Sequence, residues 1–241
     1  MLYELGFRTA PIFLIDLAYV EVIIMKELLP NIYRLTTRIK VIGPFRIPAA
    51  MYAIKDDEKL ILIDPFLLPK VKTLELEKLG APTLLLITGE MHARDADAYR
   101  KRYGAKIFAH REAIPELEIA VDETFGDDET LPGDLRTIAM PGTMTGETVF
   151  LREQEKGILI AGDAIWNMRL NECGLFLGNV MRLLGWPEGL GTMPRRFMKD
   201  QKVASESYRR LFDYDFDAIL MSHGQPILSG ARGLLRTIID A

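Results

Sequence analysis

Four short runs of aliphatic residues along the chain each stop abruptly at a polar segment. Continuous apolar runs of roughly four to eight residues are typical of strands that are buried on both faces. The runs are residues 60–63, 84–87, 157–161 and 218–221, and the segments that follow them are Asp64-Pro65, residues 88–95, Gly162-Asp163 and Ser222-His223-Gly224. The pattern therefore predicts four buried strands, each with polar side chains directly after its carboxyl end.

Charged segments of helical character alternate with these runs. A helix is predicted over residues 96–103, with Asp95 as its N-cap and Gly104 as a left-handed cap at its end. Further helices are predicted over residues 67–79, 205–212 and 228–240, the last with Ser229 as a candidate N-cap. Strands and helices in alternation predict an α/β fold with two or more layers of sheet.

The remaining segments contain further strand signals. Residues 32–41 interleave aliphatic and aromatic side chains with Arg, Thr and Lys, which predicts a strand that Pro44 and Pro48 interrupt. Residues 148–152 and 157–161 predict a β-hairpin. Residues 166–194 are apolar and rich in Gly and Met, and we expect short helices that cover another part of the molecule.

The first 24 residues do not continue this pattern. They are apolar without a clear period, and no cap or turn residues join them to Met25, which opens a segment that resembles a natural start. They are either an extra element packed on the body or on a partner chain, or upstream sequence included by an early start. The predicted organisation is an N-terminal extension of uncertain status, residues 1–24, and a single domain, residues 25–241.

Composition and charge exclude several classes of protein. A net charge of −4 over 241 residues offers no basic surface for nucleic acid or for an anionic membrane. Cys173 is the one cysteine, which excludes an internal disulfide and a cysteine-based metal cluster. The best candidate for a membrane span is too short and is interrupted by Asp16 and Glu21. We expect a cytoplasmic protein with no nucleic-acid or membrane partner.

The polar residues after the strands include the candidates for chemistry. In open α/β sheets, ligands bind just beyond the carboxyl ends of the strands. His92, Asp163 and His223 each follow a predicted strand. We expect these side chains to converge at one edge of the sheets, within reach of a single metal ion. Asp64 before Pro65 is interpreted as a turn-closing acid, and His110 as a structural residue.

The order and spacing of these motifs resemble the metallo-β-lactamase fold superfamily, from about Leu28 to the C-terminus. The motifs are Leu62-Ile63-Asp64-Pro65, residues 88–95, Pro141-Gly142, Gly162-Asp163 and His223-Gly224. The resemblance implies an α/β fold of the αββα type, a sandwich of two facing mixed sheets with helices outside.

The resemblance also implies a reduced metal site. The first loop of the family contains His-x-His-x-Asp-His, and in this chain His92 matches only the last His of that motif. Thr143 stands where the family has the His of Pro-Gly-His-Thr. Asp163 matches the bridging carboxylate, and His223 matches the final His ligand. The implied metal ligands are therefore His92, Asp163 and His223, which suffice for at most one ion.

Two hypotheses of function follow from this ligand set. In the first, the protein is a hydrolase of a small-molecule substrate. Two imidazoles and a carboxylate hold one divalent ion, either zinc or iron or manganese, and leave a position open. Glu90 can add a carboxylate, and Asp163 or Glu90 can take a proton from water. In the second, which the lost ligands favour, the chain is a metal-free relative that serves in binding or regulation. The sequence identifies neither the substrate nor the oligomeric state, and it leaves open whether the protein is an enzyme.

Overall fold

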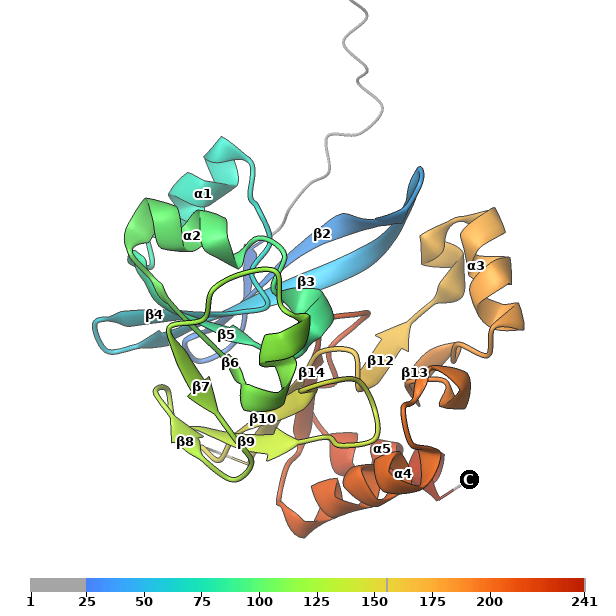
Figure 1. Ribbon diagram of the computed structural model, residues 1–241. Coiled ribbons are helices and arrows are strands. Elements are labelled where there is room, and N and C mark those ends of the chain that lie inside the picture. The colour runs from blue at the N-terminus through green and yellow to red at the C-terminus, as the bar shows by residue number, and fades with distance from the viewer. Residues whose placement is uncertain (1–24, 155, 241) are drawn as a thin grey trace, which may run out of the picture.

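Two β-sheets lie face to face, with helices on their outer faces, in the computed structural model (Figure 1). The structure describes residues 25–154 and 156–240, so both interpretations of residues 1–24 lie outside the described part of the chain. Helices α1 and α2 cover one sheet, and α4 and α5 cover the other. The predicted αββα sandwich is confirmed. No helix in the described part of the chain is long and apolar enough to span a membrane.

The first sheet has seven strands that follow one another in space as they do in sequence. They are β1 (Met25–Leu29), β2 (Ile32–Ile42), β3 (Phe45–Asp56), β4 (Lys59–Ile63), β5 (Pro82–Ile87), β6 (Lys106–His110) and β7 (Glu123–Phe125). The first four strands are antiparallel neighbours, whereas β4 to β7 run parallel. Helix α1 (Lys70–Glu77) connects β4 to β5, and α2 (Ala96–Tyr103) connects β5 to β6. The parallel arrangement places the carboxyl ends of β4 and β5 at the same edge.

The second sheet has five strands in the order β14-β11-β10-β9-β8. They are β8 (Thr130–Leu131), β9 (Leu135–Ala139), β10 (Thr148–Arg152), β11 (Ile158–Ala161) and β14 (Ala218–Met221). Strands β10 and β11 form the predicted hairpin, and β11 runs parallel to β14. The carboxyl ends of β11 and β14 therefore also meet at one edge. Helices α4 (Gln201–Arg210) and α5 (Ala231–Ile239) pack on the outer face of this sheet.

The alternation of side chains along each strand builds three apolar layers. The layer between the sheets includes Tyr52, Ile61, Ile63 and Leu86 from the first sheet and Phe150, Ile160 and Leu220 from the second. The intervening side chains face the helices: Leu62 and Leu85 pack with Leu76 of α1 and Tyr99 of α2, and Leu151 and Leu159 pack with Tyr208 of α4 and Leu235 of α5. The runs at residues 60–63 and 84–87 are continuously apolar because both of their faces are buried.

The segment over residues 166–194, predicted to contain short helices, also contains strands. Strands β12 (Ile165–Met168) and β13 (Gly189–Thr192) form a separate two-stranded sheet, and α3 (Leu175–Leu183) lies between them in sequence. The sequence does not predict β13 because glycine is depleted in strands. Gly191 is required there because a Cβ at this position would lie 2.4 Å from the ring of Pro187. The described chain also contains the short 3₁₀ helices η2 (Glu90–His92), η3 (Arg111–Glu116), η4 (Leu170–Cys173), η5 (Arg195–Phe197) and η6 (Leu211–Asp213).

The prediction that Pro48 interrupts its strand is wrong, because Pro48 lies inside β3 and pairs with Arg38 of β2. On its other side β3 pairs with β4 only from Tyr52 to Asp56. At Pro48 the strand is therefore an edge strand, where a missing N–H costs no ladder hydrogen bond. The Pro48 carbonyl is left free to bond outside the sheet.

Three details at helix ends differ from expectation. Helix α1 begins at Lys70 rather than at residue 67, because Pro69 disfavours helical backbone at the residue before it. Asp95 makes no capping bond to α2, and its carboxylate instead accepts a hydrogen bond from the Leu67 N–H at 3.0 Å. Helix α5 begins after Gly230, and Ser229 does not cap it. Gly104 ends α2 in the left-handed conformation, as predicted.

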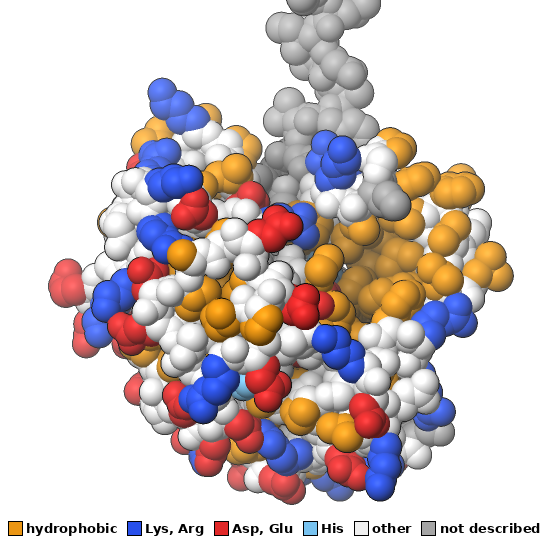
Figure 2. All heavy atoms as spheres, viewed as in Figure 1, with side chains coloured by type: hydrophobic (Ala, Val, Ile, Leu, Met, Phe, Trp, Pro, Cys, Tyr) orange, Lys and Arg blue, Asp and Glu red, His pale blue; other side chains and the backbone are white. Residues whose placement is uncertain are grey.

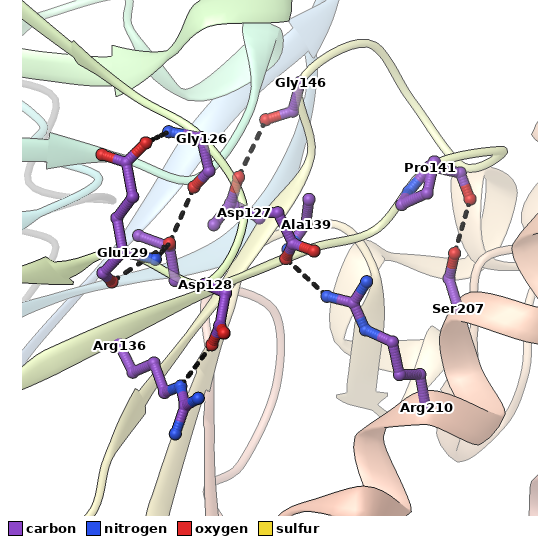
Figure 3. A network of polar contacts seen from close by, with 12 residues as sticks. Gly126, Asp127, Asp128, Glu129, Arg136, Ala139, Pro141, Gly146, Ser207 and Arg210 are labelled. Atoms are coloured by element: carbon purple, nitrogen blue, oxygen red, sulfur yellow. Dashed lines mark hydrogen bonds and ion pairs between the residues drawn. The ribbon is translucent and has the colours of Figure 1, made fainter.

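A polar network holds α4 against the loop over residues 141–147 (Figure 3). The Ser207 hydroxyl donates to the Pro141 carbonyl at 2.8 Å. The Arg210 guanidinium donates to the Asp127 carboxylate, which also accepts from the Ala139 N–H at 2.8 Å. The Asp200 N–H at the start of α4 donates to the Gly142 carbonyl at 2.9 Å, so the helix contacts this loop directly and the neighbouring strand β9 through Asp127.

We predict that Gly142→Ala destabilises the fold by about 3 kcal/mol or more, because left-handed backbone and overpacking each cost about 1–2 kcal/mol or more. Gly142 has φ +84°, and a Cβ there would lie 2.3 Å from the backbone nitrogen of Ala204 in α4. Gly104→Ala is the matched control, since Gly104 has φ +69° and open space around it. It should cost only about 1–2 kcal/mol, the cost of the left-handed backbone. Urea denaturation measures both, and equal losses would show that the contact with α4 is unimportant.

Candidate functional site

The three predicted ligand residues converge at one edge of the sandwich. His92 ends η2, directly after β5, while Asp163 follows β11 and His223 follows β14. One ligand atom from each side chain lies within 4.8 Å of the other two. The parallel strand pairs thus bring together residues that are far apart in the sequence.

Both imidazoles direct Nε2 at the Asp163 carboxylate. The distance from Asp163 Oδ1 is 3.5 Å to His92 Nε2 and 3.3 Å to His223 Nε2. When four ligand atoms each lie about 2 Å from a tetrahedral metal ion, they lie about 3.3 Å from one another. The two spacings therefore fit a metal ion held between these atoms.

Each imidazole is fixed through its other nitrogen. His92 Nδ1 lies 2.8 Å from Asp64 Oδ2, and His223 Nδ1 lies 2.9 Å from the Pro48 carbonyl oxygen. A carbonyl can only accept, so His223 Nδ1 carries the proton and Nε2 is free to act as a donor atom for a metal. This outer support orients metal-binding histidines in many proteins. The Pro48 carbonyl, at the unpaired edge of β3, thus orients the imidazole of His223.

Asp64 is not the simple turn-closing acid that its sequence context suggests. Its buried carboxylate accepts the Thr88 N–H at 2.9 Å and the hydroxyls of Thr88 and Ser222 at 2.8 Å each, in addition to His92. Asp64 follows β4, Thr88 follows β5 and Ser222 follows β14. The carboxylate therefore ties three strand ends from both sheets together.

The buried ionisable groups of the site shift one another's pKa values. Burial alone would raise the pKa of Asp64 and of Asp163, but His92 and their other hydrogen-bond donors outweigh it, and both pKa values are lowered. Burial would lower the pKa of His92, but Asp64 and Asp163 outweigh it and raise this pKa well above its ordinary value. Without a metal, His92 is an imidazolium between two carboxylates.

These shifts make the stability of the metal-free fold depend on pH. The raised pKa of His92 stabilises the fold fully below about pH 6.5, the ordinary value, and this contribution is lost as pH rises through the folded-state pKa. The lowered pKa values of Asp64 and Asp163 stabilise the fold above about pH 4. This stabilisation is lost as pH falls through the folded-state pKa values of the two acids.

Glu147 belongs to the site, and the sequence analysis missed it. It precedes β10, and the Thr148 N–H donates to the Thr88 carbonyl at 2.7 Å, which brings Glu147 beside Gly89. Its buried carboxylate accepts the Ala164 N–H at 2.9 Å. A Cβ at Gly89 would lie 2.4 Å from Glu147 Oε2. The one sequence signal is an acid directly before a predicted strand, whereas Asp163 follows a predicted strand.

Burial and the neighbouring charge of Asp163 both raise the pKa of Glu147 well above its ordinary value. The raised pKa keeps Glu147 a neutral carboxylic acid to higher pH than an ordinary glutamate. For an acid, a raised pKa in the folded state means that stability falls as pH rises above the unfolded value of about 4.3, until the folded-state pKa is reached.

The other candidates take different positions. Glu90 lines the cavity beside His92, and its buried Oε2 has no hydrogen-bond partner among the described residues. His110 Nδ1 accepts the Glu112 N–H at 3.2 Å at the start of η3, in agreement with a structural role. The pKa of His110 is lowered, mainly by burial. Burial raises the pKa of the Cys173 thiol to about 11, so it remains an unreactive thiol.

Residues 48–240 match the family model described as the metallo-beta-lactamase superfamily. No curated protein matches the chain.

Solved structures are similar in fold. The metallo-beta-lactamase from Pontibacter korlensis has a TM-score of 0.63 at 16% identity, covering 90% of this chain and 99% of that one. The metallo-beta-lactamase FIM-1 from Pseudomonas aeruginosa, in its mono-zinc form, has a TM-score of 0.62 at 13% identity, with coverages of 90% and 95%. The protein TTHA1623 in a di-iron-bound form has a TM-score of 0.55 at 17% identity, with coverages of 79% and 93%. At these identities the likeness shows a common fold.

We predict that Asp64→Asn lowers the pKa of His92, because Asp64 is the strongest of the charges that raise it. The chain has three histidines, so NMR of chelator-treated protein can follow the imidazole signals of His92 and His110 individually. In the unchanged protein the His92 titration should lie well above pH 6.5, and Asp64→Asn should bring it down. The His110 titration, below the ordinary value, is the internal control for an intact fold. If no imidazole titrates above pH 6.5, the proposed charge balance is wrong.

We further predict that Glu147→Gln stabilises the chelator-treated protein at pH 8 but not at pH 4.5. The amide keeps an acceptor for the Ala164 N–H and cannot ionise, so it avoids the loss of stability that the raised pKa of Glu147 causes with increasing pH. Thermal unfolding at both pH values measures the difference. Glu58→Gln, at an exposed acid, is the control and should give no such pH-dependent gain. A loss of stability at pH 8 would mean that the ionised carboxylate is required.

Proposed function

Because this chain belongs to the metallo-β-lactamase superfamily, we propose that it is a hydrolase that uses one divalent ion held by His92, Asp163 and His223. The observation that carries the proposal is the arrangement of the two imidazoles. Both direct Nε2 at Asp163, and both have Nδ1 held by an oxygen acceptor, the buried Asp64 carboxylate for His92 and the Pro48 carbonyl for His223. Two histidines fixed in this way are prepared to bind a metal without rearrangement.

Three protein ligands leave a coordination position open, which is typical of catalytic rather than structural sites. A bound ion would supply Lewis-acid activation of water and of a substrate carbonyl near neutral pH. Asp163 is engaged with both imidazoles, so Glu90 is the better of the two candidates for accepting a proton from water. The unpartnered, buried Oε2 of Glu90 supports this role.

The side chains around the site support one ion rather than two. Gly89 offers no ligand, and the Thr143 hydroxyl donates to the Met140 carbonyl. The Glu147 carboxyl group packs against Gly89 and next to Gly162. Zinc and iron are the first metals to test, since related structures hold one zinc in one case and two irons in another. We propose a small-molecule substrate, and a cytoplasmic location stays a prediction.

One observation favours the alternative of a metal-free binding or regulatory protein. The His92 imidazolium between Asp64 and Asp163 balances the buried carboxylates without an ion. The ordered geometry of the three ligand residues is therefore compatible with either a proton or a metal at Nε2 of His92. Metal content separates the two functions.

We predict one ion per chain in protein purified without added metal or chelator, measured by elemental analysis, with a higher melting temperature than after chelation. His223→Ala should abolish stoichiometric binding, because two protein ligands rarely retain an exchangeable ion. His110→Ala is the matched control, since its imidazole caps η3 instead.

Two outcomes would contradict this assignment. Two ions per chain would mean that further side chains bind metal. Failure to bind zinc, manganese or iron after reconstitution, with equal behaviour of the two variants, would contradict the hydrolase proposal. It would support a metal-free binding protein instead.

A further inference from the structure

A large cavity opens directly onto the candidate metal centre. Its volume is about 660 Å³, and His92, Asp163 and His223 are part of its lining. Figure 2 shows hydrophobic side chains gathered around a hollow on the face that carries α3 and the β2–β3 hairpin. Cavities of this size bind small organic molecules rather than single ions. The lining therefore carries information on the substrate.

One wall is a continuous series of aromatic rings that leads to the metal ligands. Trp166 stacks on His223 with ring centroids 4.3 Å apart, Trp186 lies 4.1 Å from Trp166, and Phe197 stacks on Trp186 at 5.4 Å. The Trp166 indole N–H donates to the Asp163 carbonyl at 2.8 Å, which fixes the series to the site. Phe197 is partly exposed at the outer end, whereas Trp166 is buried. The rings thus run from solvent to the centre.

The rest of the lining is mainly aliphatic, and its charges are mixed. The apolar residues are Ile39, Val41, Ile47, Met91, Ile119, Met144 and Met193. Lys40 and Arg94 are accompanied by Glu90, Glu116 and Glu118. Recognition of a phosphate or of another anion requires a cluster of basic groups, which this lining does not provide. A ligand that fits these walls is neutral and largely apolar.

We propose that the substrate is a neutral carboxylic ester whose larger group is apolar and lies along the Phe197–Trp186–Trp166 wall, with its carbonyl at the His92–Asp163–His223 end. This inference rests on the proposed hydrolytic function. In the reaction, the oxygen of water bonds to the carbonyl carbon, the ester C–O bond breaks and a proton passes to the leaving alcohol. The products are a carboxylic acid and an alcohol, so no further reactant is needed.

The two tryptophans of the chain, Trp166 and Trp186, both line the cavity, so intrinsic fluorescence reports directly on its occupancy. The probes are 2-hexanone, 2-octanone and 2-decanone, which carry a carbonyl and cannot be hydrolysed. Each should change the fluorescence, and the Kd should fall roughly fourfold per added methylene, as expected for burial in an apolar site. The result should be the same in protein as purified and after chelation.

Variants locate the binding site. Trp186→Ala leaves Trp166 as reporter and should raise the Kd of 2-decanone at least tenfold. Phe197→Ala, at the partly exposed end of the wall, should weaken binding as well and is less demanding for folding. Leu234→Ala changes an exposed apolar residue of α5 outside the cavity and should leave the Kd unchanged. Equal effects of all three variants would overturn the proposal.

The ligand class and the hydrolytic function can fail separately. Tighter binding of octyl phosphate than of 2-decanone would overturn the proposed apolar ester ligand. So would a Kd that does not depend on the chain length of the ketone. Hydrolysis of p-nitrophenyl octanoate faster than p-nitrophenyl acetate by the metal-loaded protein, lost in His223→Ala, would support both proposals. Chain-length-dependent binding without hydrolysis of either ester would support the apolar ligand and overturn the hydrolase.

Discussion

The buried carboxylate of Asp64 is the contact on which the geometry of the site depends. It receives hydrogen bonds from Thr88 and Ser222 and pairs with His92, so the ends of β4, β5 and β14 meet at one group. A buried carboxylate without donors would be strongly destabilising, and these donors offset the cost of its burial. The orientation of His92 follows from this arrangement, because its Nδ1 is one of the four donors. The candidate metal centre is therefore a consequence of how the two sheets are joined.

The same contact controls the charge of the site. Asp64 and Asp163 flank His92 at 2.8 and 3.5 Å, and together they raise its pKa. Burial and the charge of ionised Asp163 both raise the pKa of Glu147. A divalent ion bound at His92 Nε2 would replace the imidazolium proton and would add positive charge next to Glu147. Metal binding and the protonation of these residues are therefore linked, whichever function the protein performs.

Sequence reasoning predicted the sandwich and the convergence of His92, Asp163 and His223, because buried strands leave a strong local signal and parallel strands share an edge. It did not predict the Pro48 carbonyl as the partner of His223, since that contact depends on where β4 stops pairing with β3. It missed Glu147 because nothing in the sequence shows that β10 begins beside the end of β5. Asp95 was assigned to the wrong partner for the same reason: its acceptor role towards Leu67 is a tertiary contact.

The Gly89–Glu147 pair restricts which side chains the site can hold. A side chain at position 89 would begin 2.4 Å from Glu147 Oε2, so an imidazole at position 89 and the present position of Glu147 exclude each other. A histidine at this position would require Glu147 Oε2 to move, although Oε1 of the same carboxyl group accepts the Ala164 N–H. The carboxyl group fills the space beneath Gly89, while the other side of His92 faces the apolar cavity. That cavity is lined by His92, Asp163 and His223 but not by Glu147, so a ligand in it meets the candidate metal centre where the aromatic wall ends.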